Sequence, residues 1–232
     1  MTDTSIISFD EYKNEWLQEI LENNPTTVQL GNRFAKKLVT QWLDFDDDND
    51  EIIFCDGCGD GGIDIAYLKR SENPNEGDIW YLVQSKYGSA FNGRSTLLIE
   101  GQKVTDTLDG KTRRLSSMTN DLLERLLIFK DSLSTNDKLI LVFATNSAIS
   151  EEEKRALNDI KAIGKARVGN FFDTDSISIE TIYQRVSDNL AQYKKYKIPF
   201  SANLVPSGND LLVGSIKLIN LFQFLKDYKM EM

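Results

Sequence analysis

The order of the apolar segments limits the fold of this chain more than any other feature of the sequence. Three short strand-like segments, 52–55, 63–68 and 79–86, follow one another with only loops and turns between them. A loop at 56–62 with four glycines joins the first two, and a run of turn-forming residues at 71–78 joins the last two. This order predicts a three-strand meander, most simply antiparallel.

The segments on either side of the meander have a helical period or a continuous apolar run. Helices are expected at 8–24 and 28–43, and the segment 97–130 predicts one or two helices, bent or broken near Asp109 and Gly110. A stripe on this segment should face the core: Leu115, Met118, Leu122, Leu126 and Phe129. The apolar run 139–144 predicts a strand covered on both faces.

The rest of the chain alternates between the two kinds of element. Helices are expected at 150–163, 178–193 and 217–228, and strands at 168–172 and 211–216. The whole pattern predicts an α/β fold: a mixed sheet with an antiparallel hairpin, flanked by helices. We expect one domain over 1–232, with a helical part to about residue 50 and a strand–helix extension from about residue 198.

Composition narrows the chemistry and the surroundings of the protein. The 232 residues include no histidine, which excludes Ser-His-Asp and Cys-His hydrolysis and histidine-based zinc sites within this chain. Eight acids and no base lie between Asp44 and Asp60, so the remaining residues account for only −1 of the net charge of −9. The sequence shows no membrane-spanning run and no secretory signal, and with two cysteines it fits a cytoplasmic protein.

The residues that carry chemistry lie around the glycine-rich loop and the third strand. Asp64 begins one strand, while Gln84 and Lys86 stand two apart on the next strand and therefore point to one face. Mg²⁺ binds oxygen ligands and needs no imidazole, so Asp64 and Gln84 are candidate metal ligands. Lys86 is a candidate catalytic residue that orients or deprotonates a water nucleophile and stabilises developing charge. Mn²⁺ is the alternative ion.

The two segments GDGGIDIAYL (59–68) and YLVQSKYG (81–88) resemble the active-site hairpin of the PD-(D/E)xK nuclease superfamily, particularly its Mrr-like branch. The chain is most similar to the N-terminal nuclease region of the AIPR (abortive infection phage resistance) family, whose members are usually longer. Residues 211–228 also resemble a later part of that family. The resemblance implies a restriction-endonuclease-like fold and a metal-dependent nuclease acting on DNA or RNA in antiphage defence. Asp64, Gln84 and Lys86 match the family's motif, with Asp60 as a weaker addition.

The chain departs from the superfamily pattern at two places. Gln84 stands where many members have an acid, and the helix 28–43 contains no acid. Gln29 or Asn32 is its only polar substitute near the start, unless a glutamate of the first helix reaches the site: Glu15, Glu19 or Glu22. These departures leave open an alternative, a non-catalytic module that recognises nucleic acid or protein. Duplex cleavage by a subunit with one site would imply a homodimer.

Several other features have both a functional and a structural interpretation. Lys111, Arg113, Arg114 and Arg94 are candidate nucleic-acid contacts, as are Lys103 and the stretch 193–197, although such basic residues are more often solvated. Cys55 and Cys58 form a C-x-x-C pair, for which we expect a buried thiol and a loop thiol. The acidic run 46–50 lacks the glycine and glutamate of a calcium loop, which favours a solvated turn.

Overall fold

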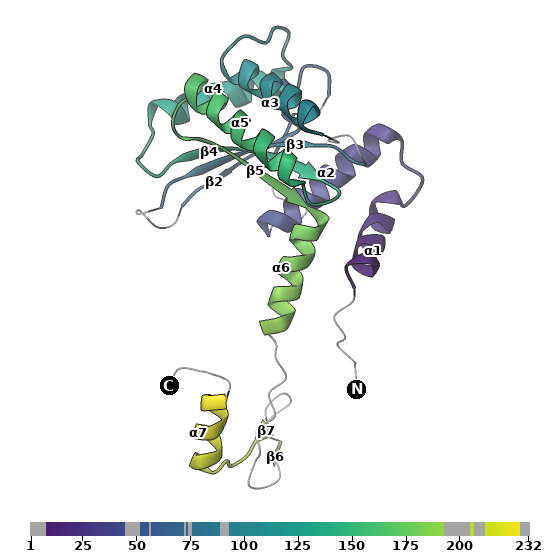
Figure 1. Ribbon diagram of the computed structural model, residues 1–232, viewed down its shortest axis with the longest axis vertical. Coiled ribbons are helices and arrows are strands. Elements are labelled where there is room, and N and C mark those ends of the chain that lie inside the picture. The colour runs from purple at the N-terminus through teal and green to yellow at the C-terminus, as the bar shows by residue number, and fades with distance from the viewer. Residues whose placement is uncertain are drawn as a thin grey trace. The chain divides into compact units, whose positions relative to one another are not determined.

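The computed structural model describes residues 8–44, 52–55, 57–71, 73, 76–88, 93–192, 205–206 and 212–227 (Figure 1). The acidic run 46–50 and the basic stretch 193–197 lie outside these residues. The chain divides into two compact units, Met1–Ser187 and Asp188–Met232. The first unit contains the five-strand sheet together with Asp64, Gln84 and Lys86. No helix in the described residues has the length and apolar character required to cross a bilayer.

The first unit is built on a mixed five-strand sheet whose spatial order follows the chain. Its strands are β1 (Ile53–Phe54), β2 (Ile65–Lys69), β3 (Ile79–Ser85), β4 (Lys138–Thr145) and β5 (Phe172–Ser178). The first three strands pair antiparallel, and β4 and β5 add to β3 in parallel. The predicted antiparallel meander and the α/β class with a mixed sheet are therefore confirmed.

Strand register determines where the candidate residues meet. Ile65 pairs with Val83 and Lys69 pairs with Ile79, so the beginning of β2 lies beside the end of β3. On the other side of β3, Ser85 pairs with Ala144 of β4. Asp64 is therefore brought to the same end of the sheet as Gln84 and Lys86.

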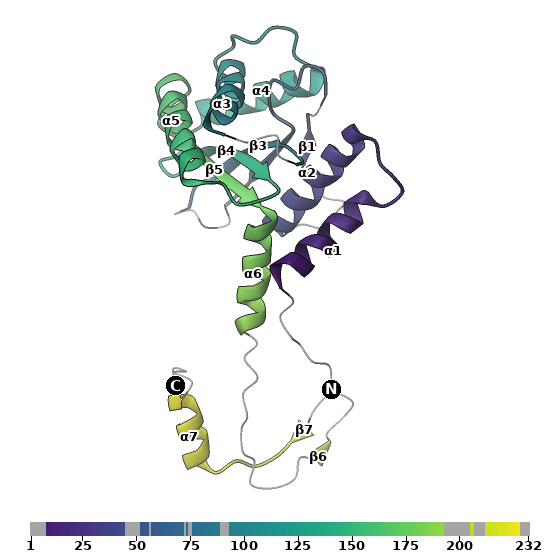
Figure 2. The same ribbon diagram turned by 45° about the vertical axis from the view of Figure 1, so that its right-hand side comes forward.

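Helices cover both faces of the sheet (Figure 2). One face carries α3 (Arg94–Leu108), α4 (Ser117–Asp131) and α5 (Glu151–Arg167). The other face carries α1 (Phe9–Leu21), α2 (Thr27–Leu43) and α6 (Ile179–Gln192). Side chains of β4 alternate between the two cores: Leu141 and Phe143 face the first set of helices, and Val142 and Ala144 face the second. This alternation explains the continuous apolar run at 139–144.

Local sequence signals set the helix boundaries. Ser8, Thr26 and Ser150 each accept a hydrogen bond from the third backbone N–H of the helix that follows, and the Glu or Gln at that position reaches back. Gly110, at φ +70°, lies in the loop between α3 and α4 at the position where a break was predicted.

Two sequence expectations on this unit are wrong. The strand expected at 168–172 is instead the end of α5 and a turn, and β5 begins at Phe172. The polar residues of β5 explain why the sequence pattern did not predict this strand. Phe172 and Ile177 are buried in opposite cores, and the positions between them are acids and hydroxyl residues. In the helical stripe, Leu122, Leu126 and Phe129 are buried as expected, but Met118 in the first turn of α4 is 46% exposed.

The second unit has a short hairpin and a helix. Strand β6 (Val205–Pro206) pairs antiparallel with β7 (Leu212–Val213), and α7 (Leu218–Asp227) follows. The expected strand at 211–216 and helix at 217–228 therefore correspond to β7 and α7. That the whole chain is one domain stays a prediction.

Candidate active site

Asp64 occupies the point where β2 and β3 begin to separate. Its backbone N–H donates to the Val83 carbonyl at 2.9 Å, as in a strand ladder. Two residues further along β3, the Ser85 N–H donates to the Asp64 side chain, with 2.6 Å between N and Oδ2. The carboxylate thus takes the place of a backbone carbonyl and is held one residue from both Gln84 and Lys86.

The glycine-rich loop that leads into Asp64 is fixed by the helices beside it. The Gly59 carbonyl accepts hydrogen bonds from the Ser116 N–H and the Thr119 hydroxyl, and the Gly61 carbonyl accepts one from Thr107. A Cβ added at Gly59, where φ is +91°, would lie 2.7 Å from the Ser116 nitrogen. The loop therefore needs glycine for close approach to α4, which explains part of its composition.

Gln84 and Lys86 share one partner that was not predicted, Glu100 of α3. The Gln84 Nε2 donates to one carboxylate oxygen of Glu100 at 2.6 Å, and the Lys86 Nζ donates to the other at 2.5 Å. Gln84 is 3% exposed, and its Oε1 has no hydrogen-bond partner in the described part of the chain. A buried amide oxygen without a partner is unfavourable unless something else binds it.

A sequence signal for Glu100 does exist. Leu97, Gly101 and Val104 are buried positions of α3 at helical spacing, and Glu100 lies on the same stripe, three residues after Leu97. An acid on a core-facing stripe marks a side chain that needs a buried partner. The superfamily pattern places such a glutamate in a helix before the hairpin, so Glu100, in the helix after it, was not predicted.

Electrostatic interactions keep Glu100 charged. Burial acts to raise the pKa of its carboxyl, but hydrogen bonds from Lys86 and Gln84, together with the charges of Lys86 and Lys103, lower it below its usual value. Asp60 has other partners than Glu100 does. Its carboxylate accepts from the Gly62 N–H at 2.7 Å and pairs with Lys103 at 3.0 Å. Asp60 therefore stabilises the loop.

A cavity of about 470 Å³ opens beside Asp64 on the α2 side of the sheet. Asp64, Ser85 and Phe54 line one side, and Asn32 and other α2 residues line the other. Asn32 is one of the two polar substitutes expected on this helix, whereas Gln29 belongs to the helix cap. None of the three first-helix glutamates lines the cavity, and Glu19 pairs with Lys37 instead.

The oxygen donors at this end of the hairpin are of the kind that a small hard cation binds, but Gln84 is not among the residues that line the cavity beside Asp64. Asp64 supplies a carboxylate and Gln84 supplies a buried amide oxygen that has no protein partner in the described residues. Within the described ranges no three acids, cysteines or histidines cluster as a metal cage. Mg²⁺ often binds through only one or two carboxylates and keeps several waters, so this donor set suits it better than zinc or calcium.

The two thiols of the C-x-x-C pair differ in their surroundings. Cys55 is buried, Cys58 is exposed, and neither forms a disulfide, as expected from the sequence. Burial, reinforced by the charges of Asp60 and Asp64, raises the pKa of the Cys55 thiol to about 11. A thiol protonated at neutral pH is a poor metal ligand and nucleophile.

The basic candidates differ in their surroundings. Arg94 pairs with Asp159 at 2.6 Å and Lys111 pairs with Asp109 at 2.7 Å, so their charges are partly compensated. Arg113 and Arg114 are exposed, and within the described residues neither makes an ion pair or a side-chain hydrogen bond. Both arginines belong to the loop before α4. The backbone of this loop contacts Gly59, so the arginines lie next to the glycine-rich loop.

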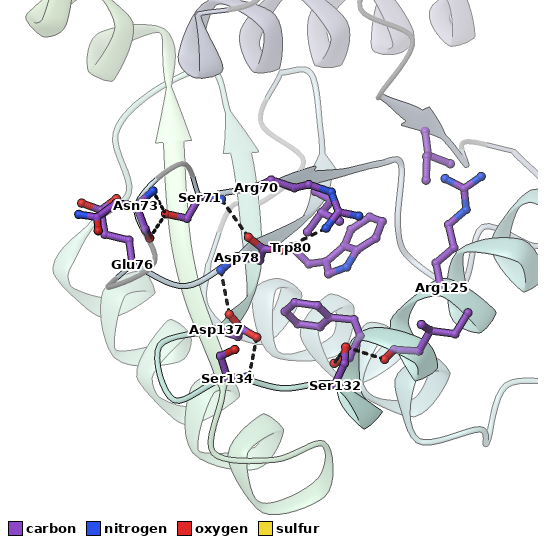
Figure 3. A pocket seen from close by; sticks show the side chains of 14 residues that line it. Arg70, Ser71, Asn73, Glu76, Asp78, Trp80, Arg125, Ser132, Ser134 and Asp137 are labelled. Atoms are coloured by element: carbon purple, nitrogen blue, oxygen red, sulfur yellow. Dashed lines mark hydrogen bonds and ion pairs between the residues drawn. The ribbon is translucent and has the colours of Figure 1, made fainter.

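A second cavity, of about 650 Å³, lies at the opposite end of the β2–β3 hairpin (Figure 3). Its carboxylates maintain local turns: Asp78 accepts from the Ser71 N–H at 2.9 Å, and Asp137 accepts from the N–H groups of Asp78 and Ser134 at 2.8 and 2.7 Å. Arg70 pairs with Asp78 at 3.3 Å. These polar groups serve the fold, and this cavity is separate from the candidate site.

Comparisons of the chain with protein families, with curated proteins and with solved structures find no match. The geometry of the candidate site therefore carries the functional argument.

Proposed function

We propose that this protein is a metal-dependent phosphodiesterase that cleaves DNA or RNA. The observation that carries the proposal is the grouping of Asp64, Gln84 and Lys86 at one end of an antiparallel hairpin, where the buried Gln84 Oε1 has no hydrogen-bond partner among the described residues. The resemblance to the AIPR family and to the Mrr-like nucleases supports the same reading. It further suggests a restriction-endonuclease-like fold and a role in antiphage defence.

Asp64 and Gln84 would hold Mg²⁺ or Mn²⁺. When bound, such an ion supplies positive charge opposite the scissile phosphate and lowers the pKa of a coordinated water. The Ser85 N–H fixes the Asp64 carboxylate, so the ligand is already oriented before an ion arrives. Preorganised ligands of this kind reduce the cost of assembling a site.

Lys86 would act on the substrate. Its side chain is 31% exposed, which lets the ammonium group reach a bound phosphodiester while Glu100 holds the group in place. An ammonium donor at this position would orient the attacking water and stabilise the additional negative charge of the transition state. The exposed Arg113 and Arg114 would contact the backbone of the nucleic acid.

The second candidate function is a non-catalytic recognition module with the same fold. The ion pair between Lys86 and Glu100 favours it, since a paired lysine is a weaker contact for phosphate, as does the net charge of −9. The two functions differ in turnover: a recognition module binds nucleic acid in the presence of Mg²⁺ without cutting it.

A cleavage screen tests the proposal. Supercoiled DNA, linear duplex, single-stranded DNA and RNA are each incubated with the protein in Mg²⁺, Mn²⁺ or EDTA. We expect metal-dependent cutting of at least one polymer and its loss in Asp64→Asn, which keeps an oxygen to accept from Ser85 but removes the charge. Binding without cutting by folded protein would favour the recognition module.

A further inference from the structure

The Glu100 side chain of α3 accepts hydrogen bonds from both Gln84 and Lys86. The two oxygens of Glu100 are divided between them, Oε2 accepting from Gln84 and Oε1 from Lys86. The Glu100 side chain is 15% exposed, so these contacts are largely shielded from water. Shielded hydrogen bonds to a charged group are stronger than those at the surface.

The charge of Glu100 determines which way the Gln84 amide faces. An ionised carboxylate has acceptors but no donor, so the Gln84 amide meets it with the NH₂ group. The Oε1 atom then faces away from Glu100, and this buried oxygen has no hydrogen-bond partner in the part of the chain that the structure describes. If Glu100 were protonated, or replaced by a neutral glutamine, the side chain would offer both a donor and an acceptor. It could then pair with the Gln84 amide in either orientation.

Packing behind Glu100 fixes its place. The next residue, Gly101, lets α3 approach α5 so closely that an added Cβ would lie 2.6 Å from the Ile160 Cδ1. Leu97 and Val104, one turn away on either side, are fully buried. The helix therefore cannot rotate or slide to move Glu100 away from β3 without disturbing the core.

We infer that Glu100 is a positioning residue: it presents the Gln84 carbonyl oxygen to a divalent cation and holds Lys86 beside it. The inference rests on the proposed function, because the cation is the one that the phosphodiesterase would use. Helix α2, before the hairpin, contains no acid. The inference gives a carboxylate of α3, after the hairpin, an indirect role at the site.

Three variants test this role: Glu100→Gln, the double variant Gln84→Glu/Glu100→Gln, and Glu124→Gln as a control. Glu124 is an exposed residue of α4. Mn²⁺ binding is measured by electron paramagnetic resonance. The orientation of Gln84 is followed without metal by the NMR signal of its side-chain amide, assigned by its absence in Gln84→Glu. Both measurements are independent of cleavage.

Glu100→Gln should weaken Mn²⁺ binding about tenfold to a hundredfold, the effect usual for a partner that orients a metal ligand. It should also shift the Gln84 amide signal, while Glu124→Gln changes neither. The double variant exchanges donor and acceptor, keeps the net charge and restores a hydrogen bond between amide and carboxylate. It should recover Mn²⁺ binding at least to the wild-type level.

Three results would overturn the inference. One is an unchanged Mn²⁺ affinity and amide signal in Glu100→Gln. A second is a folded double variant that binds Mn²⁺ no better than Glu100→Gln. The third is loss of the Gln84 contact when Mg²⁺ is added to the wild type, which would make Glu100 a ligand itself. If the wild type neither binds Mn²⁺ nor cuts any polymer, the proposed function fails and this inference with it.

Discussion

Asp60 and Asp64, which lie just before β2, look alike in the sequence but have different partners in the structure. Asp60 is used by the glycine-rich loop and by Lys103, whereas Asp64 accepts the N–H of Ser85 in the neighbouring strand. Sequence spacing predicted that Asp64, Gln84 and Lys86 lie close together, and strand register does bring them to the same end of the sheet. It did not identify Glu100, because the pairing of a helix with a strand end depends on packing that spacing does not encode.

The thiols should differ sharply in reactivity. At pH 8 we expect an alkylating reagent to label Cys58 quickly and Cys55 only after unfolding, because Cys55 is 4% exposed and its pKa is raised to about 11. Since the folded state holds this proton more tightly than the unfolded state, rising pH between the usual value of 9.0 and about 11 should destabilise the fold. Mass spectrometry of the labelled peptides measures the alkylation of each thiol. The Cys55→Ser variant should lack the part of the destabilisation at high pH that comes from Cys55.

At the scale of elements, the helix–sheet order was predictable from the sequence and the exact strand at 172–178 was not. The meander has strong signals at each boundary: apolar strands, a glycine-rich loop and a dense turn. Strand β5 has four consecutive polar residues, 173–176, and is held by parallel pairing to β4, a long-range contact. Tertiary pairing thus overrides local pattern here.

Two helical glycines should respond in opposite directions to alanine. Gly101→Ala forces a Cβ against Ile160 between α3 and α5 and should destabilise the protein by about 1–3 kcal/mol. Gly31→Ala in α2 meets nothing within 4 Å and should stabilise it by about 0.5–1 kcal/mol, since alanine favours the helix. Urea unfolding measures both. The account is contradicted if Gly101→Ala is neutral or stabilising.

At the scale of the whole molecule, both hydrophobic cores lie within the first unit. Their buried members extend from Trp16 to Ile182, with none in the second unit among the described residues. A core on each face of one sheet is the arrangement expected of an independently folding α/β domain.

Shortening the chain tests this division. A chain ending at Gln192 should unfold cooperatively and keep the NMR spectrum of the first unit, because both cores are intact. A chain ending at Arg167 lacks β5 and α6, which place Phe172 in one core and Ile177 and Ile182 in the other, and should not fold. Equal stability of the two shortened chains, or failure of the longer one to fold, would contradict the assignment.

The most direct measurement of the central claim separates metal binding from turnover with Lys86→Met. This variant keeps an unbranched apolar side chain of similar shape and removes the ammonium group, whereas Asp64→Asn removes the negative charge of a proposed ligand. In parallel assays we expect Lys86→Met to bind Mn²⁺ and to lose cleavage by about a hundredfold or more, the effect usual for a positioned proton donor or acceptor. Asp64→Asn should lose both. Cleavage by folded Lys86→Met at the wild-type rate would contradict the account.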